Sequence, residues 1–266
     1  MSLRPVIAAL AAAAAPAAAH GASLSGETGC WFEGGVVVVP AQVAGVAGDF
    51  ILDTAQPQTV LAETQAQTAG YEDKALTAEV ALAGMRQPGV AVAVEDLDVR
   101  TGLFPTPIAG VIGADVLNGH VVDLAFAPCR LRLSAPGKAP PFGRATILPL
   151  TAIAGLPTVQ ASVSDGLRTL TGAFVVSTGA DAPLRLSDTK AAAPGAAKPQ
   201  ELYPNGVLRP RLRALSLAGR LYERVMAGLF RPPDPQIAGE IGAALLHDQR
   251  IRLDLPAGRL FVAPRK

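Results

Sequence analysis

The sequence is poor in several features that define large classes of proteins. It has almost no net charge, because 23 basic side chains face 22 acidic ones and the formal charge at pH 7 is +1. Proteins that bind nucleic acids or anionic membranes carry a clear excess of basic residues, so neither partner is expected. The histidines and the scattered acids show no metal-ligand spacing, and we expect no metal site and no other cofactor.

Long hydrophobic runs are also missing, except near the N-terminus. Residues 1–22 combine a basic residue, Arg4, with an alanine-rich apolar stretch and end in small residues that suit cleavage after Ala19. This pattern predicts a secretory signal peptide, and therefore a periplasmic or secreted protein without stable membrane insertion after cleavage. The alternative is an N-terminal membrane anchor, which is disfavoured because alanine is weakly hydrophobic and Pro16 interrupts the run.

Cysteine is scarce, since only Cys30 and Cys129 are present. An oxidising compartment outside the cytosol would allow these two residues to form a disulfide. Because the bridge would close a long loop, it would stabilise the folded chain by a few kcal/mol on the chain-entropy model. The alternative is that both cysteines are small buried hydrophobic residues, and the sequence leaves both possibilities open.

Aromatic residues make up only 5% of the chain, whereas glycine and proline are frequent, with 27 and 23 copies. This composition favours many short strands and turns over long helices, and it predicts an all-β fold. The most informative pattern is a repeat, because FILDTAQP at residues 50–57 and FVVSTGAD at residues 174–181 are both apolar runs that end in a turn of small residues. The first turn contains Asp53, and the second has Ser177 at the same place.

Further blocks repeat in the same order. The segments that start at Ile108 and Ile237 align without a gap, and ten of their residues are identical at positions 129 apart. A hairpin pattern precedes both segments, and the shared order indicates an internal duplication of a unit of roughly 100 residues. We therefore predict an N-terminal lobe at residues 23–134, a Pro/Gly-rich linker at 135–147 and a C-terminal lobe at 148–266.

An apolar strand that ends in Asp-Thr-Gly or Asp-Thr-Ala, followed later by two apolar residues and a glycine before a short helix, resembles the aspartic peptidases of the retropepsin and pepsin type. The resemblance covers nearly all of the chain after residue 22. It implies a duplicated, two-lobed acid-protease fold with a short helix in each lobe, in which the two turns meet across a pseudo-two-fold axis and the lobes enclose an extended peptide. The residues that match the catalytic turns of the family are Asp53, Thr54, Ala55, Ser177, Thr178 and Gly179.

The second turn departs from the family at the residue that carries the chemistry. Two carboxyl groups held close together share one proton, so that one activates water while the other protonates or polarises the substrate. A serine hydroxyl cannot hold that shared proton, so Asp53 and Ser177 form a degenerate dyad. We therefore expect a pseudopeptidase that binds extended peptides, or a very weak peptidase. A monomer is expected because each chain carries both lobes.

One residue could compensate for the missing acid. Glu240 stands where the first copy has Val111, and the resemblance implies that this position lines the substrate site. Because a glutamate in a buried strand is unusual, one alternative is an active aspartic endopeptidase that uses Asp53 with Glu240. Glu240 could equally be an edge charge or a polar residue of the substrate pocket without a catalytic role. A third hypothesis for the chain is a structural or interaction protein of the cell envelope.

Overall fold

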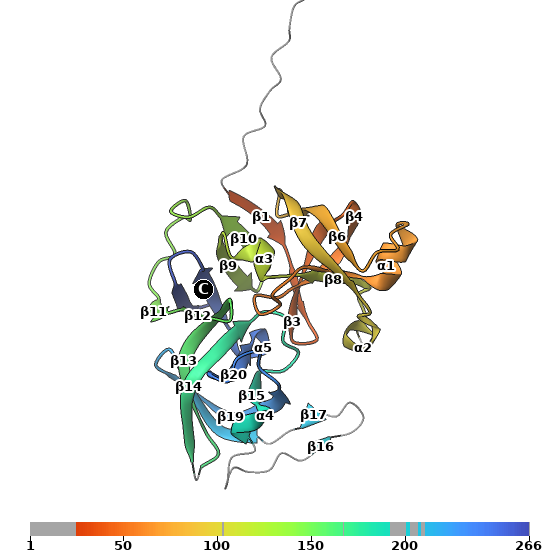
Figure 1. The fold of residues 1–266 in the computed structure, drawn as a ribbon. Helices are drawn as coiled ribbons and strands as arrows, with labels where there is room; N and C mark the ends of the chain where they lie inside the picture. Colours follow the sequence, from red (N-terminus) through yellow and green to blue (C-terminus); the bar gives the residue numbers. More distant parts are fainter. Residues whose placement is uncertain are drawn as a thin grey trace, which may run out of the picture.

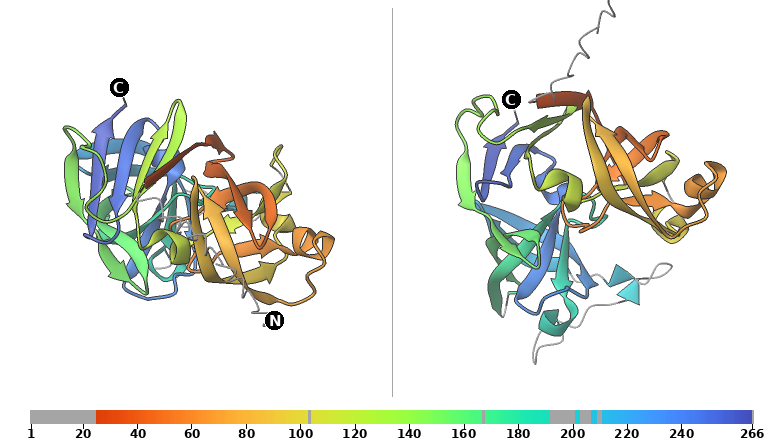
Figure 2. Two further views of the ribbon diagram at one scale, coloured as in Figure 1. Left: turned by 90° about the horizontal axis from the view of Figure 1, so that it is seen from above. Right: turned by 45° about the horizontal axis from the view of Figure 1, so that its top comes forward.

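The computed structural model describes residues 25–102, 104–166, 168–191, 201–202, 207–208 and 211–265. The predicted signal peptide lies outside the described residues. Two lobes built mainly of strands lie side by side, one coloured red to yellow and the other green to blue (Figure 1 and Figure 2). A further sheet takes strands from both halves of the chain and joins the lobes.

The N-terminal lobe is a closed sheet of seven strands. Its strands are β2 (Trp31–Glu33), β3 (Val36–Val43), β4 (Val46–Leu52), β5 (Val60–Ala62), β6 (Ala75–Leu82), β7 (Met85–Glu95) and β8 (Ile108–Ile112), and its helices are α1 (Glu63–Thr68), α2 (Asp98–Thr101) and α3 (Ala114–Leu117). The spatial order is β2-β3-β4-β8-β5-β7-β6, and an additional pairing of β3 with β6 closes the sheet.

The C-terminal lobe repeats this arrangement. Its strands are β12 (Thr151–Ile153), β13 (Leu156–Ser164), β14 (Thr169–Ser177), β15 (Leu184–Ser187), β18 (Arg211–Leu217), β19 (Arg220–Phe230) and β20 (Ile237–Gly242), and its helices are α4 (Asp188–Ala191) and α5 (Ala243–Leu246). The order is β12-β13-β14-β20-β15-β19-β18, with an additional pairing of β13 with β18. A separate pair consists of β16 (Glu201–Leu202) and β17 (Val207–Leu208).

Corresponding strands thus occupy the same place in both lobes, which confirms the predicted all-β fold built from a duplicated unit. Helices α3 and α5 follow β8 and β20 at corresponding positions and are the short helices that the sequence predicts. Helices α1, α2 and α4 are additional to that prediction. Of these, α2 contributes a residue to the site described below.

The sheet between the lobes is central to how the two halves are held together. It consists of β1 (Ser25–Gly29), β9 (Val121–Phe126), β10 (Cys129–Ser134), β11 (Thr146–Pro149), β21 (Gln249–Asp254) and β22 (Arg259–Pro264), in the order β1-β10-β9-β21-β22-β11. The equivalent strands β9 and β21 pair antiparallel at its centre, where Asp123 lies opposite Arg252. Arg252 Nε donates to Asp123 Oδ1 at 2.5 Å and Nη2 donates to Oδ2 at 2.8 Å. Two positions that are 129 residues apart have therefore diverged into an ion pair.

The structure joins Cys30 and Cys129 in a disulfide, with an S–S distance of 2.00 Å. Their Cα atoms are 4.9 Å apart, within the range that such bridges require. Cys30 lies between β1 and β2, and Cys129 begins β10. The bridge therefore links the start of the N-terminal lobe to the sheet between the lobes.

Two central strands carry the repeated turns, and both are buried on both faces. In β4 the residues Phe50, Ile51 and Leu52 are fully buried, and the corresponding part of β14 is equally inaccessible. Each pairs in parallel with a strand that contains a glycine, Gly110 in β8 or Gly239 in β20. A Cβ at Gly110 would lie 2.2 Å from the carbonyl oxygen of Val60, so only glycine allows this close packing.

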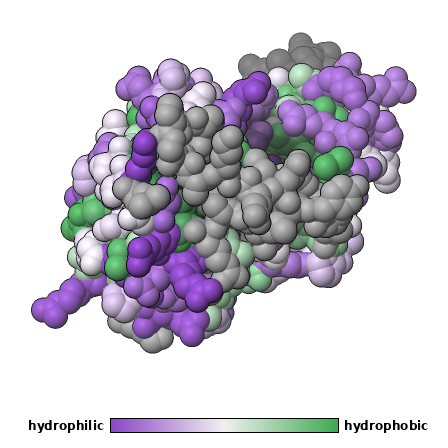
Figure 3. Space-filling model, turned by 90° about the horizontal axis from the view of Figure 1, so that it is seen from below, coloured by the Kyte–Doolittle hydropathy of each residue, from purple (hydrophilic) through white to green (hydrophobic). Residues whose placement is uncertain are grey.

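The face of the molecule seen from below is mainly hydrophilic where described residues form it. In the view from below, purple and white residues predominate on the coloured surface and green ones form separate small clusters (Figure 3). The large hydrophobic residues that are well exposed, Val99, Ile147 and Leu221, belong to three different elements. No helix in the described part of the chain combines the length and the apolar character needed to cross a membrane.

Candidate active site

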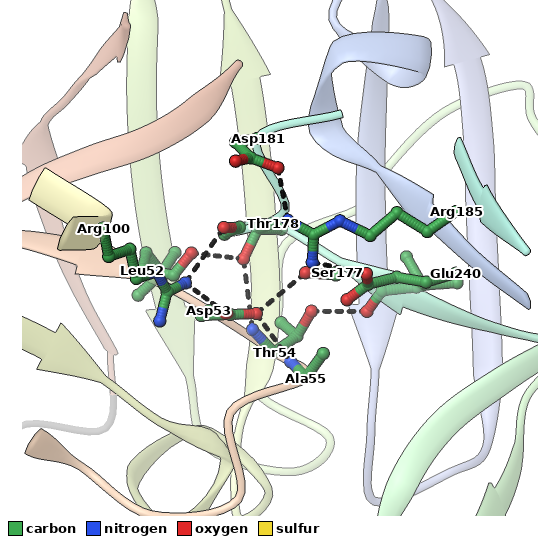
Figure 4. A network of polar contacts seen from close by, with 12 residues as sticks. Leu52, Asp53, Thr54, Ala55, Arg100, Ser177, Thr178, Asp181, Arg185 and Glu240 are labelled. Carbon is green, nitrogen blue, oxygen red and sulfur yellow. Dashed lines mark hydrogen bonds and ion pairs between the residues drawn. The ribbon is translucent and has the colours of Figure 1, made fainter. Parts of the chain in front are cut away.

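Asp53 and Ser177 lie next to each other where the two lobes meet, as Figure 4 shows. Asp53 follows β4 directly, and Ser177 is the last residue of β14. The backbone N–H of Asp53 donates to the carbonyl oxygen of Ile112 at 2.9 Å, which extends the parallel pairing of β4 and β8 into the turn. The repeated strands thus bring both turns together, as the sequence indicates.

The Asp53 carboxyl group is almost completely buried, since the residue is only 5% exposed, and both of its oxygens accept hydrogen bonds. Its Oδ1 accepts hydrogen bonds from the Ser177 hydroxyl and from the backbone N–H of Ala55, both at 2.9 Å. Ser177 itself is fully buried. The serine hydroxyl therefore occupies the place opposite Asp53 and donates a hydrogen bond to that carboxyl group.

The two threonines cross-link the turns. The Thr54 hydroxyl donates to the carbonyl oxygen of Val176, and the Thr178 hydroxyl donates to that of Leu52, both at 2.6 Å. The Thr178 hydroxyl also accepts a hydrogen bond from the backbone N–H of Thr54 at 3.2 Å. Because all these groups are buried, the bonds replace hydration that the backbone has lost and fix the relative position of the two turns.

The third residue of each turn is small for a steric reason. A Cβ at Gly179 would lie 2.4 Å from the Asp53 carboxyl carbon, so any side chain there would displace the acid. Ala55 packs against a small apolar cluster of the C-terminal lobe, formed by Leu156, Val175 and Ile237. Both residues let the two backbones approach closely around Asp53.

Arg100 is a member of the site that the sequence did not predict. It lies in α2, and its Nη2 donates to Asp53 Oδ2 at 2.9 Å and to the carbonyl oxygen of Gly179 at 3.0 Å. The Arg100 side chain is 34% exposed, whereas that of Asp53 is only 7% exposed. The guanidinium group therefore covers the acid from the solvent side and contacts both lobes.

A second ion pair lies on the other side of Ser177. Arg185 in β15 and Glu240 in β20 are directly opposite each other in an antiparallel pair. Arg185 Nη1 donates to Glu240 Oε2 at 3.1 Å, and Nη2 forms an ion pair with Asp181. Figure 4 shows the Arg185 guanidinium between these two acids, on the opposite side of Asp53 and Ser177 from Arg100.

Glu240 is a buried acid with an altered pKa. Burial raises the pKa of the Glu240 carboxyl, and the nearby negative charge of Asp53 raises it further. The positive charge of Arg185 and hydrogen bonding with Ser177 and Arg185 oppose this effect without cancelling it. The carboxyl of Glu240 therefore holds a proton at a higher pH than an ordinary glutamate does.

Comparison with known proteins gives a result at the level of the fold. The sequence matches no family model and no curated protein. The structure is similar to the crystal structure of an aspartic proteinase from Irpex lacteus, with a TM-score of 0.55 and 14% sequence identity. The match covers 91% of this chain and 98% of that chain.

The fold is that of a pepsin-like aspartic proteinase. This finding confirms the predicted two-lobed acid-protease architecture, with one barrel-like sheet in each lobe. The turns at Asp53 and Ser177 lie at the ends of the central strands of this pepsin-like fold. At 14% identity the likeness extends to the fold and does not transfer an activity.

The two residues predicted to bind substrate, Val111 and Glu240, lie in different surroundings. Val111 is fully buried in an apolar cluster with Ile51 and Val60, and its part in substrate binding stays a prediction. Glu240 is close enough to Asp53 and Ser177 to be influenced by both. Among the described residues, no group of three or more histidine, cysteine or acidic side chains is arranged to hold a metal ion.

Proposed function

We propose that this protein binds an extended peptide or protein segment between its lobes and does not hydrolyse it efficiently. The pepsin-like fold supports a peptide as the ligand. An extended segment can bind by adding its backbone to exposed strand edges, and such binding does not require a catalytic dyad. The proposed ligand is therefore compatible with the loss of the second acid at Ser177.

The observation that carries this proposal is the complete engagement of the Asp53 carboxyl group. Its Oδ1 accepts from Ser177 and Ala55, and its Oδ2 faces the guanidinium of Arg100. A general base must accept a proton from water and a general acid must release one, but a guanidinium remains charged at all working pH values. Asp53 consequently has no partner in these contacts that could share a proton with it.

We also propose that the protein acts in the periplasm or after secretion, as a monomer. The disulfide between Cys30 and Cys129 supports an oxidising compartment, because the cytosol keeps most thiols reduced. The presence of two complete lobes in one chain supports the monomer, since each chain supplies both turns of the site.

The proposal is tested by measuring binding and cleavage with the same peptides. Fluorescent peptide pools should bind the purified protein saturably between about pH 4 and 7, and mass spectrometry should detect no cleavage beyond that of a blank. Acid-dependent cleavage that disappears in Asp53→Asn would contradict the proposal and identify a working peptidase. The absence of both binding and cleavage would instead favour a structural or interaction role in the cell envelope.

A weak aspartic peptidase is the second candidate, and the position of Glu240 favours it. Its buried carboxyl group lies beside Ser177 and has a raised pKa, so it could supply the proton that the serine cannot hold. In this case any slow cleavage at acid pH should be lost in both Glu240→Gln and Asp53→Asn. Cleavage that persists in Glu240→Gln would exclude this residue from the mechanism.

A further inference from the structure

The two lobes differ most in chemistry at one cross-strand pair beside the site. In the N-terminal lobe Val60 of β5 pairs with Val111 of β8, and both side chains are buried. In the C-terminal lobe the corresponding strands β15 and β20 place Arg185 opposite Glu240. The same backbone arrangement thus holds two valines in one copy and an ion pair in the other.

An ion pair at this place is not required for the stability of the fold. Burying two charged groups costs hydration free energy that their attraction repays only in part, and an apolar pair of similar size is often as stable or more stable. The valine pair shows that the fold accepts the apolar solution at this place. An ion pair that the fold does not need points to a role for the guanidinium outside the fold.

The surroundings of Arg185 leave its guanidinium accessible. The side chain is 29% exposed, and the neighbour of Arg185 on β19 is Gly228, where a Cβ would lie 3.5 Å from Arg185 Cγ. Arg185 Nε makes no hydrogen bond within the described part of the chain, while the two terminal nitrogens contact Glu240 and Asp181. The Nε–H of this partly exposed guanidinium is therefore a donor that a ligand could use.

The two acids that hold Arg185 differ in how easily they can be replaced. The Glu240 side chain is 9% exposed, whereas that of Asp181 is 64% exposed. An exposed ion pair contributes between about 0 and 1 kcal/mol, so a ligand carboxylate can take the place of Asp181 at little cost. Asp181 thus occupies the position in which an external carboxylate would bind in bidentate fashion to the guanidinium.

We propose that Arg185 recognises a carboxylate of the bound peptide, either an acidic side chain or the C-terminal carboxyl group. This inference rests on the proposed function, because it specifies the ligand of the same site. Arg100 is the other cation of the site, but its guanidinium is already committed to the buried Asp53 and to Gly179 of the opposite lobe. Arg185 differs from Arg100, because its partner Asp181 is exposed and a ligand carboxylate could replace it.

The protonation of Glu240 is coupled to this recognition. The groups that face Glu240 are Arg185, Asp53 and Ser177, and Asp181 lies on the far side of the guanidinium. Because burial raises the pKa of Glu240, the acid becomes neutral at a higher pH than an ordinary glutamate does, and it then leaves part of the Arg185 charge uncompensated. A ligand carboxylate should bind more tightly under those conditions.

The test uses peptide pools that differ in a single carboxyl group. One pair of capped pools carries Glu or Gln at the central position, and a second pair carries a central Ala with a free or an amidated C-terminus. We expect the wild-type protein to bind the charged member of at least one pair about tenfold more tightly, a difference of about 1.4 kcal/mol. The first pair detects an acidic side chain as the source of the carboxylate, and the second detects the C-terminus.

Two variants test whether Arg185 is responsible. The double variant Arg185→Val/Glu240→Val copies the N-terminal lobe and should bind charged and neutral pools equally. Asp181→Asn should tighten binding of the charged pool severalfold and leave the neutral pool unchanged, and because Asp181 is exposed this variant does not threaten the fold. Asp248→Asn, which removes another exposed partner of an arginine in the same lobe, is the matched control and should change neither.

The outcomes separate this inference from the proposed function. Equal affinity of the wild-type protein for charged and neutral pools overturns carboxylate recognition and leaves peptide binding intact. A charge preference that survives in the double-valine variant, or an Asp181→Asn variant that behaves like Asp248→Asn, also overturns the role of Arg185. If no pool binds at all, both the inference and the proposed function fail.

Discussion

Replacing Ser177 by aspartate restores the acid that the second turn lacks, and the structure predicts what this change does. The serine hydroxyl oxygen lies 2.9 Å from Asp53 Oδ1, in a place that solvent does not reach. A carboxyl group introduced there must lie within about 4 Å of the Asp53 carboxyl. Two charged carboxylates at about 4 Å repel each other by about 4 kcal/mol at an effective dielectric constant of about 20.

This repulsion can be expressed as a change in protonation. A penalty of about 4 kcal/mol corresponds to an upward shift of about 3 units in the pKa of the introduced carboxyl group. Arg100 reduces the penalty by its positive charge, and the acid of Glu240 on the other side increases it. We therefore expect Ser177→Asp to lose about 2–4 kcal/mol of stability as the pH rises from about 4 to 7.

The sign of the effect follows from the direction of the shift. When the pKa of a carboxyl group is raised in the folded state, its contribution to stability is fully present below the unfolded pKa, about 3.9, and is lost as the pH rises through the folded pKa. Urea unfolding at several pH values measures the loss, and Ser177→Asn serves as the uncharged control of similar size. If both variants show parallel stability curves between about pH 4 and 7, the two carboxyl groups do not interact as the structure requires.

The remaining predictions concern the hydrogen bonds and ion pairs that hold the site. Thr178→Val should cost about 2–4 kcal/mol, because it orphans two buried backbone groups, and unchanged urea midpoints would contradict the cross-link. Arg252→Met should cost about 3 kcal/mol by leaving the partly buried carboxylate of Asp123 unpaired, and Asp123→Asn in the same background should recover most of the loss. Because burial raises the pKa of Glu240, the folded state should lose stability as the pH rises above about 4.3. Glu240→Gln should make the stability less dependent on pH. If the wild-type protein and the variant show parallel curves of stability against pH, this prediction is wrong. Ser177→Asp should gain peptide cleavage only when Arg100→Ala is added, and cleavage by the single variant would show that Arg100 does not block Asp53.

The repeated pattern identified two equivalent turns in the sequence, and the resemblance to aspartic peptidases implied that they meet. The apolar runs before Asp53 and Ser177 are each buried on both faces, so their length and spacing fix the place of the turn that follows. The glycines of the closing segments, such as Gly110, mark close backbone packing that a single residue type permits. Because the same constraints act in both copies, the alignment of the copies identifies equivalent positions in space.

Arg100 could not be found in this way, because it has no counterpart in the second copy. The segment between Glu95 and Ile108 has twelve residues, whereas the corresponding one between Phe230 and Ile237 has six. The greater length of this segment in the N-terminal copy was the one sign in the sequence of an additional element near the site. Its meaning depends on the path of an exposed segment, which tertiary contacts decide and local patterns do not.

The pairing of Arg185 with Glu240 was hidden for a related reason. The sequence indicated that Glu240 was unusual in a buried strand, but it did not reveal the register between β15 and β20 that places an arginine opposite it. A carboxyl group that is paired with a guanidinium differs in its pKa and hydrogen bonding from an isolated carboxyl group. The partner, and not the acid alone, decides whether Glu240 can exchange a proton with Ser177.

The changes in the two copies have the same electrostatic consequence. In the N-terminal copy, which has Asp53, an additional segment supplies Arg100 to that acid. In the C-terminal copy, which has Ser177, Arg185 and Glu240 stand where the N-terminal copy has a valine pair. A proton-sharing dyad requires two carboxyl groups that face each other without a permanent cation between them and the substrate. Here each buried acid faces a guanidinium, and Ser177 stands between the two pairs. We therefore expect that Ser177→Asp alone does not produce proton transfer and that Arg100→Ala is needed as well.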